Sequence, residues 1–423
     1  MEHNKIELKK GITMHLIKTD KFKTNLISVI LSTELNKETV TKNAMIPVIL
    51  KRGSKNMPTQ EELSKSFEEM YGARFDCGID KSGDNQILKF YIESVAEEYL
   101  PNEGGNNLEL SINKLLEIVF NPYLEEDCFK KEYVEQEKEN LKQIIESKID
   151  NKGRYASDRC IEEMYKNESF GLYKFGYTED LKNMDEKDLY KNYLELIKNC
   201  KVDIFVSGNL TEQAEKLIKE NENISNLQER EANYARMNFK EKEDVEKEVN
   251  VVEEKMDVAQ GKLTLGLDLN ASKEQKAACQ LYNAILGGSA NSKLFQNVRE
   301  KESLAYHASS TYMRLKNNIF INSGIEIQNY EKALDIIKKQ IEDMRDGNFT
   351  EKDIENSKKS IIDSIRTVDD EQDSQITYIF GQEMSGEKLS LEKYQENINK
   401  VNKEEILDVA KGVAINTIYF LRN

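Results

Sequence analysis

The chain has few of the residues that bind metals, form disulfides or interrupt secondary structure. Its 423 residues include three histidines, five cysteines, four prolines and no tryptophan. The cysteines lie far apart and form no C-x-x-C pair. Neither a disulfide framework nor a zinc knuckle is therefore expected, and the thiols should be reduced and mostly buried.

Positive charge and long apolar runs are also scarce. Acidic residues outnumber basic ones by 77 to 61, which gives a net charge of −16. This argues against a nucleic-acid-binding protein, which needs a basic surface. The longest uncharged run, Ala277–Ser292, is too short and too polar to span a membrane, and Met1–Lys10 lacks the apolar core of a signal peptide. We expect a cytoplasmic protein with no nucleic-acid and no membrane partner.

The two halves of the sequence predict the same order of helices and strands. The first half contains a strand, an apolar helix with a glycine stop, a second helix, a strand, a third helix and a long charged helix. They are expected at Leu26–Leu31, Ala44–Leu50, Glu61–Tyr71, Ile87–Ile92, 112–119 and from Leu124. The second half repeats this order at Lys262–Leu267, Ala277–Leu286, 294–298, Ile319–Ile327, 333–341 and from Thr350, where Asp353 completes a capping box.

These repeated patterns predict a duplicated domain. The expected fold class is α+β, with two tandem homologous domains, each a mainly antiparallel sheet covered by helices. The first domain is expected at 1–219 and the second at 246–423, joined by a charged linker at 220–245. The charged stretch itself runs from Glu220 to Lys255.

The segment Asn291–Tyr306, with the sequence NSKLFQNVREKESLAY, carries a resemblance to a known family. It is similar to the second domain of the pitrilysin/insulinase-like zinc peptidases, which include the subunits of mitochondrial processing peptidase. Gly287-Gly288 and the strand at Asp203–Leu210 extend the resemblance over almost the whole chain. Within the family, the chain resembles a bacterial group of non-catalytic homologues. Members of that group are encoded beside an active relative, and some are named for an association with 5-aminopentanol modification of elongation factor P.

Active family members carry H-x-x-E-H on the apolar helix of the first domain. Both histidines bind zinc and the glutamate activates the bound water, because residues three and four apart share one helix face. When the family's helix end is aligned to Arg52-Gly53-Ser54, the motif falls on Ala44-Met-Ile-Pro-Val48. Ala44 and Val48 replace the histidines and Pro47 replaces the glutamate. The resemblance therefore implies a chain with no metal and no cofactor, which is not a peptidase by itself.

The other metal-ligand candidates are isolated in the sequence. His15 and His307 have no acidic residue or histidine three or four positions away, and His3, with Glu7, lies in a terminal tail that is expected to fray. Each is interpreted as an ordinary surface or core histidine. The helix at Tyr133–Leu141 resembles the place where the family keeps its remaining glutamate ligand. Without histidine partners, its acidic residues are expected to form a solvated face: Glu135, Glu137, Glu139 and Glu146.

The motif segment retains Arg299 and, seven residues later, Tyr306. In the family, an arginine and a tyrosine at this spacing face the zinc across the cavity. The arginine can hold a substrate carbonyl or carboxylate, and the tyrosine hydroxyl can donate to an oxyanion. The alternative is structural, with an arginine at a helix end and a buried tyrosine that opens a strand.

The resemblance implies a non-catalytic subunit of a zinc-peptidase-like heterodimer. A partner with an intact H-x-x-E-H motif would supply zinc and base, and this chain would supply cavity wall, Arg299 and Tyr306. The chain would form one half of a clamshell around an unfolded peptide. A second hypothesis is a peptide-binding or scaffold protein without peptidase activity, in a translation-factor modification pathway. A third is an enzyme of another class that reuses the cavity, for which the sequence shows no nucleophile–base pair or cofactor motif.

Overall fold

The computed structural model describes residues 2–101, 106–209, 212–232, 234 and 248–423, and the chain folds as two compact units. Unit 1 combines Met1–Glu146, Leu172–Ala235 and Glu371–Ile379. Unit 2 combines Ser147–Gly171, Arg236–Asp370 and Phe380–Asn423. Within the described residues, no helix is both long enough and apolar enough to cross a lipid bilayer. All five cysteines are free thiols, four of them buried, as the sequence predicted.

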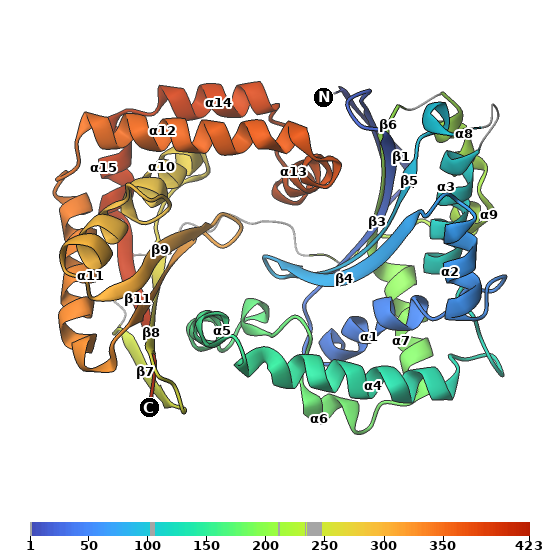
Figure 1. Cartoon of the computed structure of the whole chain (residues 1–423), viewed down its shortest axis with the longest axis horizontal. Coiled ribbons are helices and arrows are strands. Elements are labelled where there is room, and N and C mark those ends of the chain that lie inside the picture. Colours follow the sequence, from blue (N-terminus) through green and yellow to red (C-terminus); the bar gives the residue numbers. More distant parts are fainter. Residues whose placement is uncertain (1, 102–105, 210–211, 233, 235–247) are drawn as a thin grey trace. The chain divides into compact units, whose positions relative to one another are not determined.

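Unit 1 is built on a six-stranded sheet in the order β1-β2-β6-β3-β5-β4 (Figure 1). Its strands are β1 (Glu2–Lys9), β2 (Ile12–Lys18), β3 (Thr24–Glu34), β4 (Arg74–Ser82), β5 (Asn85–Val95) and β6 (Lys201–Gly208). Neighbouring strands are antiparallel except β2 and β6, which run parallel. Alternate residues of the central strand β3, such as Ile27, Val29 and Leu31, join the hydrophobic core beneath the helices.

The helices of unit 1 pack mainly on one face of this sheet. They are α1 (Val40–Leu50), α2 (Gln60–Glu68), α3 (Asn107–Phe120), α4 (Lys131–Glu146), α6 (Thr178–Leu181), α7 (Glu186–Asn199), α8 (Glu212–Glu220) and α9 (Glu222–Ser225). Helix α1 contacts β4 and β5 on one side and α4 and α7 on the other. This position explains why nine of its eleven residues are buried.

Unit 2 is built on a five-stranded sheet in the order β7-β11-β8-β10-β9. Its strands are β7 (Asn250–Lys255), β8 (Gly261–Leu269), β9 (Ala305–Met313), β10 (Asn318–Ile325) and β11 (Val413–Arg422). Its helices are α5 (Lys152–Met164), α10 (Lys276–Leu286), the π-helix η5 (Phe295–Lys301), α11 (Tyr330–Arg345), α12 (Glu351–Arg366), α14 (Leu391–Lys400) and α15 (Lys403–Lys411). Helix α13 (Gln372–Ser385) is divided between the units at Ile379.

The two sheets share one topology. In chain order, the strands β2, β3, β4, β5 and β6 correspond to β7, β8, β9, β10 and β11, and both sets lie in the same spatial order. In each sheet the first and last strands of the set are parallel and the other pairs are antiparallel. Helices α1 and α10 each follow the second strand of their set. The predicted α+β fold with two related, mainly antiparallel sheets is therefore confirmed.

Helix α5 belongs to the first half of the sequence but packs on the second sheet. Its residues Ala156 and Cys160 join a core with Phe320 and Tyr419 of that sheet. The contact is close, since a Cβ added at Gly266 would lie 2.6 Å from the sulfur of Met164. The sequence-based boundaries did not include this exchange, because a helical pattern shows that one face is buried but not which sheet buries it.

Several predicted elements differ from the structure. The helix expected at Glu61–Tyr71 ends at Glu68, and Tyr71 has a left-handed φ of 58°. The strand expected at Asp203–Leu210 ends at Gly208, and Leu210 lies outside the described residues.

The long charged helix of the first half begins at Lys131, because Glu126 and Asp127 have left-handed φ values of 50° and 61° that no α-helix allows. The helix expected at 294–298 is the π-helix η5, and the strand expected at Ile319–Ile327 ends at Ile325. The last residues of the charged stretch predicted at Glu220–Lys255 form strand β7. Residues 233 and 235–247 of this stretch lie outside the described residues.

Candidate functional site

The helix that would carry the zinc motif is α1, and its motif positions hold no metal ligand. Ala44 and Pro47 are buried and Val48 is half-buried. Ala44 packs in the hydrophobic core of unit 1. An alanine, a proline and a valine offer no lone pair for zinc and no base for water, so these residues do not fit the metal that the family resemblance suggests. Among the described residues, no group of three histidine, cysteine, aspartate or glutamate side chains could hold a metal ion.

Pro47 lies in the interior of α1. It has no N–H, so the intrahelical hydrogen bond to the carbonyl of Asn43 is lost. The Pro47 carbonyl oxygen accepts two hydrogen bonds, one from the backbone N–H of Lys51 at 3.1 Å and one from the thiol of Cys77 at 3.3 Å. Burial raises the pKa of the Cys77 thiol to about 12. It therefore stays protonated at neutral pH, whereas the thiolate is the nucleophile and metal ligand.

A buried ion pair between Arg52 and Glu137 joins the end of α1 to α4. Nε of Arg52 donates to Oε1 of Glu137 at 2.6 Å, and the guanidinium lies 5.5 Å from the centroid of the Tyr133 ring. The Glu137 side chain is only 9% exposed. The prediction of a solvated face is therefore wrong for Glu137, because the guanidinium of Arg52 compensates its burial. It is confirmed for Glu135, Glu139 and Glu146, which are exposed.

His15 is a core histidine with partners that are distant in sequence. Its Nε2 lies 3.2 Å from Oδ1 of Asp203 on β6, and its Nδ1 lies 3.1 Å from Nε2 of His3 on β1. The His15 ring also stacks on Phe205 with centroids 4.3 Å apart. Burial opposes ionisation of Asp203, yet Lys201 and His15 together lower its pKa below the ordinary value. The expectation that His3 lies in a frayed tail is wrong, because His3 is part of strand β1 and pairs with Ile17 of β2.

Arg299 and Tyr306 lie on neighbouring elements of unit 2. Arg299 belongs to the π-helix η5, which packs against β9, and Tyr306 is the second residue of β9. The guanidinium of Arg299 lies 4.5 Å from the centroid of the Phe295 ring, and the side chain is 43% exposed. π-Helical turns are rare and are often found at functional sites.

Tyr306 is exposed, whereas the structural alternative expected a buried tyrosine. It is 72% exposed, and within the described part of the chain its hydroxyl has no hydrogen-bond partner. Its neighbours Ala305 and Ala308 are buried and hold the strand in place. The structure thus presents the phenol to solvent from an anchored strand, where it is available to donate a hydrogen bond to a ligand.

The sequence did not indicate the Arg52–Glu137 and His15–Asp203 pairs, because their members lie 85 and 188 residues apart. The only local signal was the presence of charged residues at the end of an apolar helix and inside an apolar strand. Charge at such positions is usually compensated by a partner, but a single sequence does not identify the partner.

Comparison with known proteins gives consistent results. Residues 183–361 match the family described as "Peptidase M16 inactive domain". The chain is 34% identical over 419 residues to the Bacillus subtilis (strain 168) protein "Probable inactive metalloprotease YmfF", covering 97% of this chain and 96% of that one. A conserved protein from Enterococcus faecalis V583 has a crystal structure that matches 100% of this chain and 99% of its own, with a TM-score of 0.90 and 30% identity. The structure of a peptidase M16 inactive domain from Pseudomonas fluorescens shares the fold, with a TM-score of 0.80, 16% identity, and coverage of 100% of this chain and 98% of its own.

Proposed function

Because the chain belongs to the M16 peptidase family as a non-catalytic member, we propose that it is a peptide-binding subunit that pairs with a zinc-containing M16 chain. The observation that carries this proposal is the contrast between two sites. The zinc motif on α1 has no ligands, whereas Tyr306 is exposed on β9.

The proposed division of work follows from the residues present. The partner would supply the zinc ion and the general base, which together generate the nucleophilic water. In this chain Arg299 would hold a carbonyl or carboxylate of the bound peptide through its planar group of donors. Tyr306 would donate a hydrogen bond to the oxyanion that forms when water attacks the scissile carbonyl. Such donors accelerate a reaction only where a metal-bound water is available, so pairing is required.

A second candidate is a peptide-binding or scaffold protein without any link to peptide cleavage. The buried, ligand-free helix α1 fits this function equally well. The resemblance to homologues associated with modification of elongation factor P would place such a scaffold in a translation-factor modification pathway. The two candidates differ in one measurable respect, which is whether peptide turnover by a complex depends on Tyr306.

The test is peptide turnover by this chain reconstituted with the M16 partner that copurifies with it. Tyr306→Phe removes only a hydroxyl, and loss of one oxyanion donor typically lowers the rate by about 10²–10³. We expect this loss in kcat, with the complex intact by gel filtration. Arg299→Ala should also raise KM, because a charged group contacts the ground state as well. Wild-type turnover by both variants would favour the scaffold.

Metal content provides an independent check. We expect the isolated chain to bind no stoichiometric zinc and to cleave no peptide. Restoring Ala44→His, Pro47→Glu and Val48→His together should not readily produce activity, because Glu137 is held by Arg52 and α1 is buried. One tightly bound zinc per wild-type chain, with chelator-sensitive cleavage, would contradict the proposal.

A further inference from the structure

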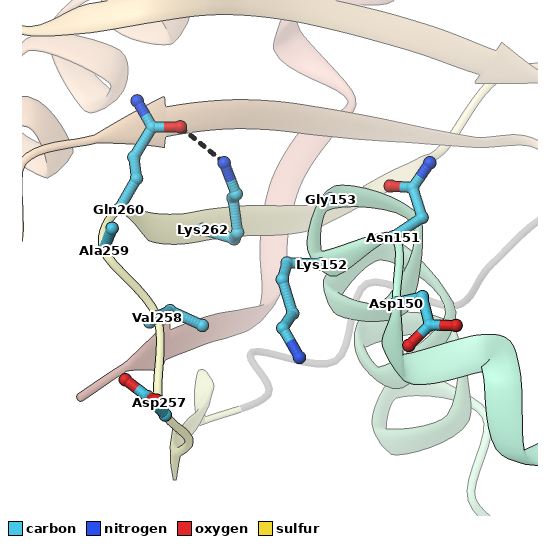
Figure 2. A pocket seen from close by; sticks show the side chains of 9 residues that line it. All are labelled: Asp150, Asn151, Lys152, Gly153, Asp257, Val258, Ala259, Gln260 and Lys262. Carbon is cyan, nitrogen blue, oxygen red and sulfur yellow. Dashed lines mark hydrogen bonds between the residues drawn. The ribbon is translucent and has the colours of Figure 1, made fainter.

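The two lysines that line the cavity of unit 2 do not point to a common site. The cavity of about 660 Å³ lies between the start of α5 and the loop that leads into β8. Figure 2 shows that the ammonium groups of Lys152 and Lys262 point in opposite directions, with Lys262 turned to the amide oxygen of Gln260. A ligand site needs polar groups that converge. A cation with a fixed orientation lies elsewhere in unit 2, at Arg299 on the π-helix η5.

Arg299 is placed over the ring of Phe295 by the shape of the helix that carries both. Side chains of a helix lean toward its N-terminus, so Arg299 reaches back over the preceding turn. The hydrogen bonds of a π-helix close between residues five apart instead of four. One turn therefore takes more residues than in an α-helix, and residues four apart come nearly one above the other. Phe295 and Arg299 are four apart, and the guanidinium lies 4.5 Å from the centroid of the ring.

The stack leaves the donors at the edge of the guanidinium open. Arg299 is 43% exposed, and its guanidinium forms no hydrogen bond with any residue that the structure describes. Glu300 is its ion-pair partner, but Oε1 of Glu300 lies 3.7 Å from Nε, which is beyond hydrogen-bond distance. The N–H groups of an arginine lie in the plane of the guanidinium. A ring on one face therefore does not block an acceptor that approaches in that plane.

The backbone that joins Arg299 to Tyr306 is fixed by the turn that ends η5. The N–H of Ser303 donates to the carbonyl of Arg299 at 3.1 Å, and Ser303 has a left-handed φ of 52° that turns the chain toward β9. This turn sets where the backbone of Arg299 lies, but the guanidinium is at the end of a long, flexible side chain. Its orientation therefore depends on a contact of the side chain itself, and the ring of Phe295 provides one.

Residues other than Phe295 anchor η5 to unit 2. Leu294 and Val298 are fully buried. Asn297 donates to Oε1 of Gln340 on α11 at 2.6 Å. Phe295 is only half-buried. A change of its ring should therefore leave the main contacts of the helix in place.

We infer that Phe295 is a positioning residue, which holds the guanidinium of Arg299 ready to donate to a carbonyl of the bound peptide. The inference rests on the proposed function, in which Arg299 contacts the peptide, and it adds the residue that orients this contact. A free arginine side chain loses rotational freedom when it binds a ligand, whereas a stacked guanidinium has lost much of it already. Phe295 therefore strengthens peptide binding through Arg299, without touching the peptide itself.

The first test uses the full chain alone, with ¹⁵N-labelled arginine. The Nε–H signal of Arg299 is assigned by its loss in Arg299→Lys, and a proton above an aromatic ring is shifted upfield. We expect an upfield shift that Phe295→Leu abolishes and Phe295→Tyr retains, because tyrosine keeps the ring face. Glu300→Gln is the matched control. It removes the ion pair with Arg299 but leaves the ring, so the shift should persist.

The second test is peptide turnover by the reconstituted pair. Phe295→Leu should raise KM by about two- to fivefold, the value of a cation–π contact at an exposed site, with kcat nearly unchanged. Phe295→Tyr should restore the KM of the wild type. In an Arg299→Ala background, Phe295→Leu should have no further effect, because a residue that acts only through Arg299 then has nothing to position. Gel filtration checks that each variant still forms the complex.

The inference is overturned if the Arg299 signal is unchanged in Phe295→Leu, if Glu300→Gln abolishes the shift, or if Phe295→Leu raises KM equally with and without Arg299. The last result would show a structural role for the ring. The proposed function is tested by different variants, Arg299→Ala and Tyr306→Phe. If both turn over peptide as the wild type does, the proposed function fails, and the stack is a structural contact only, even where the NMR shift depends on Phe295.

Discussion

Replacement of Arg52 by methionine should destabilise unit 1 by removing the cation that pairs with the buried carboxylate of Glu137. The Glu137 side chain is 9% exposed and that of Arg52 is 22% exposed, so the pair is largely shielded from water. Breaking a buried ion pair by removal of one partner costs about 3–5 kcal/mol. The partial exposure of Arg52 reduces this, and we expect a loss of about 2–4 kcal/mol in the free energy of unfolding.

The neighbouring pair provides a matched control. Lys51 and Asp76 form an ion pair at 3.0 Å, but their side chains are 41% and 39% exposed. An exposed pair contributes about 0–1 kcal/mol, so Lys51→Met should have little effect on unfolding. Both variants change one cation at the end of α1 to the same apolar side chain, and only the burial of the carboxylate differs.

Urea unfolding followed by circular dichroism measures both losses. If the cost is that of an uncompensated carboxylate, Glu137→Gln should restore much of the stability when added to Arg52→Met, because the buried group is then neutral. Equal effects of the Arg52 and Lys51 substitutions, or no rescue by Glu137→Gln, would refute the reasoning.

Two further predictions concern stability. The folded-state pKa of Asp203 is lowered, so its contribution is present above the unfolded-state pKa and is lost as pH falls through the folded-state pKa. Asp203→Asn should therefore lower the free energy of unfolding by a few kcal/mol at pH 7. The difference in unfolding free energy between the variant and the wild type should shrink below about pH 4, and urea titrations at both pH values measure it. Gly287→Ala should lower the free energy of unfolding by about 1–3 kcal/mol, because the added Cβ would lie 2.6 Å from the backbone nitrogen of Ser310. Gly78→Ala is the control, since a Cβ at Gly78 meets no atom within 4 Å and should avoid such a clash. Equal thermal shifts for the two glycine variants would contradict the packing argument.

Local patterns were sufficient to predict the elements that depend on neighbouring residues. The alternation in Lys262–Leu267 corresponds to β8, and the capping box at Thr350 and Asp353 starts α12 as predicted. The loss of zinc ligands at Ala44 and Val48 was also visible, because a missing side chain needs no structural context. These features are determined within a few residues of the chain.

Features that depend on distant residues were not predictable from one sequence. The left-handed conformation of Glu126 and Asp127 moves the start of α4 by several residues, although neither residue type requires it. The burial of Glu137 depends on Arg52, and the setting of His15 depends on Asp203. Likewise, nothing in the pattern of residues 152–164 indicates that α5 covers the second sheet.

The placement of α5 has a consequence for synthesis on the ribosome. The helix ends at Met164, and β8, the first central strand of the sheet that it covers, starts at Gly261. About 100 residues are made in between, which takes roughly 5–20 s at typical translation rates. During that interval Ala156 and Cys160 lack their partners in the second sheet, so nascent chains arrested before residue 261 should remain sensitive to proteases at α5. A fragment that begins at residue 246 would lack α5, so Phe320 and Tyr419 of the second sheet would lose their packing partners on that helix.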